Sequence, residues 1–145
     1  MKILVLNGPN LNLLGQRDKA VYGTVTLAEI EKHLKTCCPE LSFEFVQSNH
    51  EGELIDALQK ARTSGTDGVV ANWGGFTHTS VAIHDALELL TIPKVEVHLS
   101  NIHAREEFRE RSVTGRAMHG VITGFGVQSY VLGVEAVLHL IRADK

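Results

Sequence analysis

The chain has 145 residues, 43% of them apolar, and a formal net charge of −3 at pH 7. That length predicts one domain covering residues 1–145, and the interspersed acidic and basic residues disfavour nucleic acid as a partner. No stretch reaches the roughly 20 consecutive apolar residues of a membrane span, and the short apolar run at the N-terminus is unlike a secretory leader, so we expect neither a membrane partner nor a leader.

Short apolar runs alternate along the chain with longer segments of helical period, a pattern typical of a parallel sheet covered by helices. The predicted strands are Lys2–Asn7, Leu41–Gln47, Gly68–Asn72, Lys94–Val97 and Gly120–Thr123. Five such units predict an α/β fold, a flavodoxin-like doubly wound five-stranded parallel sheet with helices on both faces. The order of the strands in the sheet is left open.

Four helices are expected between and after these strands. The first begins at Thr26, where Glu29 stands at the position that completes a capping box. The others begin at about Glu51, after Ser80 and at about Val127. The last helix is apolar over more than one stripe, so it either lies deep against the sheet or also packs on a second subunit.

Polar residues and glycines follow three of the predicted strands, in segments 7–10, 72–75 and 98–101. In open α/β sheets, ligands bind beyond the carboxyl ends of the strands. We therefore expect Asn10, Asn72 and His98 to converge on one crevice. Gly74 and Gly75 either allow a ligand to approach the backbone closely or form a plain tight turn.

The connection from Gly8 to Val25 is 18 residues long, whereas such connections usually have about 2 to 6 residues. A loop of this length is often a lid, and this one carries Arg17 and Tyr22. A cation within about 4 to 6 Å lowers the pKa of an acidic group, so Arg17 could make Tyr22 a base in a closed, dry site. The alternative is an exposed charge and a loop anchor.

Other chemistries find less support in the sequence. His78 and His84 are six residues apart, and His98 and His103 five apart, so neither pair has the i, i+4 spacing of metal ligands on one helical face. We expect no metal site. Schiff-base chemistry needs a lysine at the site and is also disfavoured, because every lysine except Lys19 is expected away from the proposed crevice.

The chain has two cysteines, Cys37 and Cys38, which are adjacent and poorly placed for a mutual disulfide. We interpret them as reduced residues of a cytoplasmic protein, with redox chemistry as the alternative.

Five segments together resemble a known family, type II 3-dehydroquinate dehydratase, over nearly the whole chain. The segments are LVLNGPNLNLLGQR, VYG, QSNHEGELID, GFTHTSVAIHDAL and VEVHLSNIHAREEFR. The resemblance implies a flavodoxin-like, cofactor-free lyase that dehydrates 3-dehydroquinate in the shikimate or quinate pathway. It also implies a homododecamer built from trimers.

The resemblance implies an anti elimination through an enolate, with five catalytic residues. Tyr22 would remove the proton beside the ketone, and Arg17 would lower the pKa of Tyr22 and stabilise the transition state. Asn10 would position a water molecule or the substrate near the developing oxyanion. His98 would protonate the departing hydroxyl, and Glu96 would orient His98; taken singly, Glu96 reads as a solvated or ion-paired carboxylate.

The resemblance also implies a set of substrate-binding residues, Asn72, His78, Asp85, Leu99, Ser100 and Arg109. Leu99 would contribute its backbone N–H, and Asp85 would reach the site of a neighbouring subunit. Taken singly, Asp85 also reads as a solvated or ion-paired carboxylate.

Two segments depart from the pattern of the family. Trp73-Gly74-Gly75-Phe76 replaces a usual Pro-Gly-Ala-Tyr, and segment 114–118 replaces a serine-proline stretch. The first change keeps Asn72 and the first glycine. The second change means that the family pattern does not predict the shape of that loop. The alternatives to the lyase are a flavodoxin-like module that binds a polar ligand without chemistry, and an enzyme for another hydroxy-ketone acid.

Overall fold

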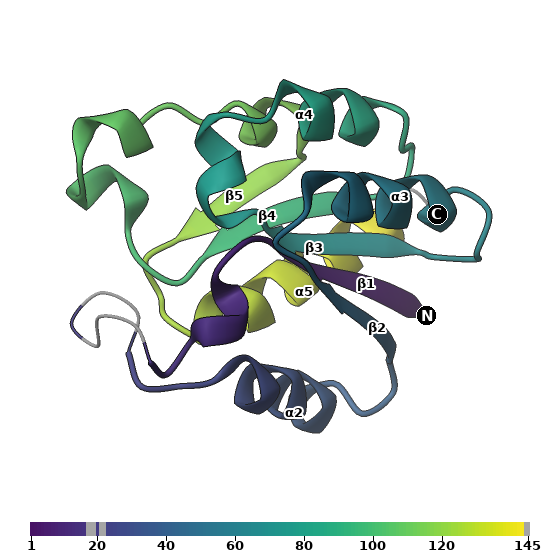
Figure 1. Cartoon of the computed structure of the whole chain (residues 1–145). Helices are drawn as coiled ribbons and strands as arrows, with labels where there is room; N and C mark the ends of the chain where they lie inside the picture. Colours follow the sequence, from purple (N-terminus) through teal and green to yellow (C-terminus); the bar gives the residue numbers. More distant parts are fainter. Residues whose placement is uncertain (17–19, 21–22, 144–145) are drawn as a thin grey trace.

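Five parallel strands form one sheet in the order β2-β1-β3-β4-β5 (Figure 1). The strands are β1 (Lys2–Asn7), β2 (Ser42–Gln47), β3 (Gly68–Asn72), β4 (Lys94–His98) and β5 (Gly120–Thr123). The predicted bounds agree to within one residue, and the flavodoxin-like doubly wound sheet is confirmed. The computed structural model describes residues 1–16, 20 and 23–143.

The helices lie in two layers, one on each face of the sheet (Figure 1). They are α2 (Leu27–Cys37), α3 (Glu51–Ala61), α4 (Val81–Glu88) and α5 (Gln128–Ala143). Ile3 and Val5 of β1 pack in the apolar cluster with α2 and α5, whereas Leu4 and Leu6 pack in the cluster with α3 and α4. Successive side chains of a strand point to opposite faces, so each apolar strand supplies both layers.

The start of α2 is stabilised by the predicted capping box. The backbone N–H of Glu29 donates to Oγ1 of Thr26 at 3.3 Å, and the N–H of Thr26 donates to Oε2 of Glu29 at 2.8 Å. The hydrogen bonds from the backbone and then the side chain of Thr26 lower the pKa of Glu29. These contacts satisfy two of the N–H groups that a helix start leaves without partners.

Helix α5 lies deep against the sheet, which confirms the first of the two readings of its apolar surface. Tyr130, Val134 and Val137 are fully buried. A Cβ atom at Gly133 would stand 2.6 Å from the side chain of Val97, so the absence of a side chain there lets the helix approach β4 closely. Within the described part of the chain, no helix combines the length and apolarity of a membrane span.

Five short 3₁₀ helices were not expected from the sequence. They are η1 (Leu11–Leu13), η2 (Gly74–His78), η3 (Ile102–Ala104), η4 (Glu107–Arg109) and η5 (Thr114–Ala117). Helices of three to five residues are too short to produce a periodic apolar pattern. Leu11 and Leu14 are buried in the core, so the first part of the long connection packs on the sheet.

Candidate active site

A cavity of about 150 Å³ lies where β1, β3 and β4 end. Its walls are Pro9, Asn10, Leu11, Asn72, Gly74, Gly75, His98, Leu99, Ser100, Ile102, Arg105 and Arg109. The parallel register sets Asn7 of β1 beside Asn72 of β3, which brings the turns that follow these strands together. The three polar strand ends therefore meet at one cavity, as the sequence predicted.

His98 forms a buried pair with Glu96, two residues before it on β4. Nε2 of His98 lies 2.7 Å from Oε1 of Glu96, and the two side chains are 7% and 0% exposed. An ionised carboxylate only accepts hydrogen bonds, so this contact assigns a proton to Nε2. Glu96 is thus buried and hydrogen-bonded to His98 rather than solvated.

The side chain of Asn72 is held from both ends. Its Oδ1 accepts from the N–H of Gly74 at 3.2 Å, and its Nδ2 donates to Oη of Tyr130 at 3.1 Å. The Tyr130 hydroxyl donates in turn to Oδ1 of Asn7 at 2.6 Å. Burial raises the pKa of Tyr130, which keeps this phenol neutral. One N–H and one lone pair of the fixed amide remain for a ligand.

Asn10 has the left-handed backbone conformation, with φ of 67°, alone among the described residues other than glycine. Its N–H donates to Oδ1 of Asn49 at 2.9 Å, and Nε2 of Gln47 donates to that oxygen at 3.3 Å and to the carbonyl of Gly8 at 3.2 Å. Strained backbone of this kind concentrates at functional sites. Asn49 and Gln47 therefore support Asn10 from behind, a role the sequence did not indicate.

Two arginines form one side of the cavity. Nε of Arg109 donates to Oε2 of Glu106 at 2.8 Å, and Nη1 of Arg105 donates to Oγ of Ser100 at 3.4 Å. A hydrogen bond from its own backbone, and then Arg109, lower the pKa of Glu106, so this carboxyl is ionised near neutral pH. The described walls thus carry two guanidinium groups, which suit an anionic ligand.

Comparisons with known proteins agree with this site. Residues 1–138 match the family model described as dehydroquinase class II. The chain belongs to this family. Among solved structures, the type II dehydroquinase of Butyrivibrio crossotus shares 45% of residues and superposes with a TM-score of 0.93, covering 95% of this chain and 97% of that one.

Relatives named 3-dehydroquinate dehydratase are similar over nearly their whole length. The protein of Chlorobaculum tepidum is 54% identical, over 94% of this chain and 93% of its own. That of Fusobacterium nucleatum is 52% identical, over 98% of this chain and 97% of its own. The class II dehydroquinases are lyases, so the predicted class of enzyme is confirmed.

The structure of this class II dehydroquinase does not bring all predicted residues together. His78 is absent from the described cavity walls, and its Nδ1 contacts the carbonyl of Arg111 at 2.8 Å. Asp85 is exposed on α4 and is also absent from those walls. Arg17 and Tyr22, the predicted activator and base, lie outside the described residues, as does Lys19.

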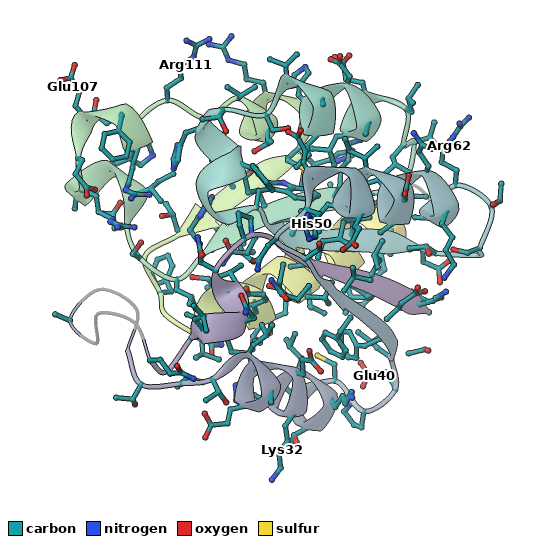
Figure 2. The ribbon with its side chains drawn as sticks, viewed as in Figure 1. Lys32, Glu40, His50, Arg62, Glu107 and Arg111 are labelled. Atoms are coloured by element: carbon teal, nitrogen blue, oxygen red, sulfur yellow. The ribbon has the colours of Figure 1, made fainter. Side chains whose placement is uncertain are left out.

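Arg105 is a charged residue of the cavity wall that was not predicted from the sequence, although it belongs to the quoted HAREEFR segment. The clue was the spacing of four residues between Arg105 and Arg109. Figure 2 shows that Glu107 of this segment, and Arg111 two residues after it, project outward. Charge alone could not separate these residues, because the direction of each side chain depends on η3 and η4.

The two departures from the family pattern have different structural outcomes. Trp73 is fully buried in the apolar cluster beneath α3 and α4, while Gly74 and Gly75 still line the cavity. Thr114 begins η5 and is also fully buried. Its hydroxyl donates to Oε2 of Glu96 at 2.6 Å. Segment 114–118, which departs from the family pattern, therefore contacts the carboxylate that is hydrogen-bonded to His98.

Proposed function

We propose that the protein, as a single catalytic domain of residues 1–145, dehydrates 3-dehydroquinate to 3-dehydroshikimate. The observation that carries the proposal is the buried His98–Glu96 pair at a cavity that Arg105 and Arg109 line. A histidine paired with a carboxylate suits general-acid catalysis, and the arginines suit an anionic substrate. Membership of the class II dehydroquinases supports the same assignment.

The first step is removal of a proton from the carbon beside the ketone. Tyr22 is the proposed base, and Arg17 is proposed to lower the pKa of Tyr22 and to stabilise the transition state. The electron pair of the broken C–H bond moves into an enolate. Asn10 and Asn72 are proposed to position a water molecule or the substrate at the developing oxyanion, and the rigid amide of Asn72 suits that role.

The second step is departure of the hydroxyl group as water. The enolate collapses to the conjugated enone, the C–O bond breaks, and His98 donates the proton that the leaving group needs. His98 must be an imidazolium to do so, and ionised Glu96 at 2.7 Å stabilises that form. The two proton transfers occur on opposite faces of the substrate ring, so the elimination is anti.

The substrate itself is proposed to be held by polar groups around the cavity. Ser100 and Arg109 lie in the described walls, and Leu99 would offer its backbone N–H. His78 would join them if its ring left the carbonyl that it now contacts. Asp85 would come from a neighbouring subunit of a homododecamer built from trimers.

The proposed reaction needs neither a cofactor nor a metal, because both proton transfers use side chains of the protein. It would serve the shikimate pathway of aromatic amino acid biosynthesis, or quinate breakdown, in the cytoplasm. A chelator, or borohydride with substrate, should leave turnover unchanged. Inhibition by either reagent would support a metal or a lysine mechanism instead.

The direct test adds 3-dehydroquinate to the purified, assembled protein and follows the ultraviolet absorbance of the conjugated product. Absence of a signal would overturn the proposal and favour a binding module. Tyr22→Phe should abolish turnover while substrate binding is largely retained. His98→Gln should also abolish it, whereas the control His103→Gln, five residues along and exposed, should not.

A further inference from the structure

The carboxylate of Glu96 is held by more than its pair with His98. Oε1 accepts from Nε2 of His98 at 2.7 Å and from Oγ1 of Thr77 at 3.1 Å. Oε2 accepts from Oγ1 of Thr114 at 2.6 Å. Both threonines and Glu96 are fully buried. A buried carboxylate is costly unless its lone pairs find donors, and three donors at two oxygens match the ionised form.

Hydrogen bonds hold the two threonines in place. The N–H of Val113 donates to the carbonyl of Thr77 at 2.8 Å, which ties η5 to the end of η2. The carbonyl of Val113 contacts Nδ1 of His84 on α4 at 2.9 Å. Val113, the residue before Thr114, is therefore hydrogen-bonded through both its N–H and its carbonyl. This fixes the direction from which the Thr114 hydroxyl contacts Glu96.

This arrangement decides which nitrogen of His98 can serve the substrate. Nε2 is occupied by Glu96, and no described residue forms a hydrogen bond with Nδ1. Because His98 is also part of the cavity wall, Nδ1 is the nitrogen left to donate a proton there. A glutamate held at Oε1 alone could rotate its carboxylate plane, whereas the contact of Thr114 with Oε2 blocks that rotation.

We propose that Thr114, together with Thr77, is a positioning residue that holds ionised Glu96 so that His98 presents Nδ1 to the substrate. The proposal rests on the proposed function, since it needs His98 as the acid. Thr114 is the better residue to test. Among the described residues its hydroxyl is hydrogen-bonded to Glu96 alone, whereas that of Thr77 also lies 3.5 Å from Nε2 of His98.

The test compares Thr114→Val, which removes the hydroxyl but keeps the shape, with Thr114→Ser, which keeps the hydroxyl. Loss of a hydrogen bond to a charged group changes an equilibrium or rate constant by a factor of about 10 to 100. Thr114→Val should therefore lower kcat about 10-fold to 100-fold. KM should change less than about twofold, because Thr114 is not part of the described cavity wall. Thr114→Ser should recover most of kcat.

The matched control is Thr66→Val. Thr66 is 6% exposed, and its hydroxyl is hydrogen-bonded to Ser64 at 3.0 Å. It precedes β3, at the edge of the sheet opposite the cavity. This variant should lose stability without losing kcat. Thermal melts followed by circular dichroism check each variant, and Thr114→Ala replaces Thr114→Val if the valine variant does not fold.

Three results would overturn the inference while the wild type is active. They are an unchanged kcat in Thr114→Val, a failure of Thr114→Ser to recover kcat, and an equal loss of kcat in Thr66→Val. A wild type that does not convert 3-dehydroquinate would overturn the proposed function and this inference together. The two failures are thus distinguished by the activity of the wild type.

Discussion

Glu96→Gln separates the charge of the buried carboxylate from its shape. The amide oxygen can still accept from His98 and Thr77, as Oε1 does in the structure. The amide NH₂ would then face Thr114, whose hydroxyl can turn to accept instead of donate. The three contacts of the side chain are kept, although the hydroxyl hydrogen of Thr114 loses its acceptor. The larger change is loss of the negative charge beside His98.

The expected loss follows from the distance between the charges. Two unit charges 2.7 Å apart attract by about 6 kcal/mol at an effective dielectric constant of about 20. Desolvation of both groups offsets part of this, and truncating one member of a buried charge pair generally costs about 2–5 kcal/mol. If Glu96→Gln removes about 2–4 kcal/mol of the stabilisation of charged His98, kcat should fall about 30-fold to 1000-fold.

The assay measures kcat by product absorbance and the free energy of unfolding by urea titration. The free energy of unfolding should fall by about 1–3 kcal/mol, because the buried hydroxyl hydrogen of Thr114 loses its acceptor. Glu40→Gln is the control, since Glu40 is exposed beside α2 (Figure 2). A kcat within about threefold of wild type would refute the orienting role of Glu96. A loss of unfolding free energy well above about 3 kcal/mol would make the effect on kcat structural.

Three further predictions concern the scaffold around the site. Tyr130→Phe leaves two buried asparagine amides without their partner, so the free energy of unfolding should fall by about 1–3 kcal/mol in urea at pH 7. The pKa of Tyr130 is raised in the folded state, so the unfolded chain ionises first as the pH rises above about 10. The free energy of unfolding of the wild type should then fall, relative to Tyr130→Phe, by up to about 1.4 kcal/mol per pH unit. Parallel curves of unfolding free energy against pH would contradict this. Thr26→Ala should cost about 1 kcal/mol through loss of the capping box. Because the pKa of Glu29 is lowered, its share of that stability is full above about pH 4.3 and is lost as the pH falls through the folded pKa. A cost that stays constant over the whole acid range would be inconsistent with this. Gly8→Ala would place a Cβ 2.2 Å from the carbonyl oxygen of Trp73, a backbone atom, so it should cost at least about 1–3 kcal/mol in urea, and a wild-type midpoint would show that this turn can move.

Local signals predicted much of the fold. The capping box at Thr26 and Glu29 needs residues three apart, and it formed as expected. The apolar runs of β1 and β3 are buried on both faces, and their bounds match the prediction. The convergence of Asn10, Asn72 and His98 followed from one rule about parallel sheets, because carboxyl ends of parallel strands share an edge.

The site was predicted less completely where contacts join distant segments. Arg105 was missed because its direction depends on two short 3₁₀ helices that leave no periodic pattern. The burial of Trp73 was likewise not indicated, since a residue after a strand can turn to solvent or to the core. His78 was expected at the site from a resemblance, and its ring instead contacts the carbonyl of Arg111. Asp85, expected at the site of a neighbouring subunit, is exposed on α4.

The sequence by itself determined the alternation of strands and helices, the helix starts and the polar strand ends, since these depend on residues close together in the chain. The tertiary structure alone decided the strand order and the surroundings of Glu96. The hydroxyls of Thr77 and Thr114 reach that carboxylate from 19 and 18 residues away along the chain. Such contacts carry no local signature, because each threonine alone would also fit a turn or a helix cap. They arise when the packing of α4, η5 and β4 buries the carboxylate, so that these hydroxyls and His98 replace water as its donors.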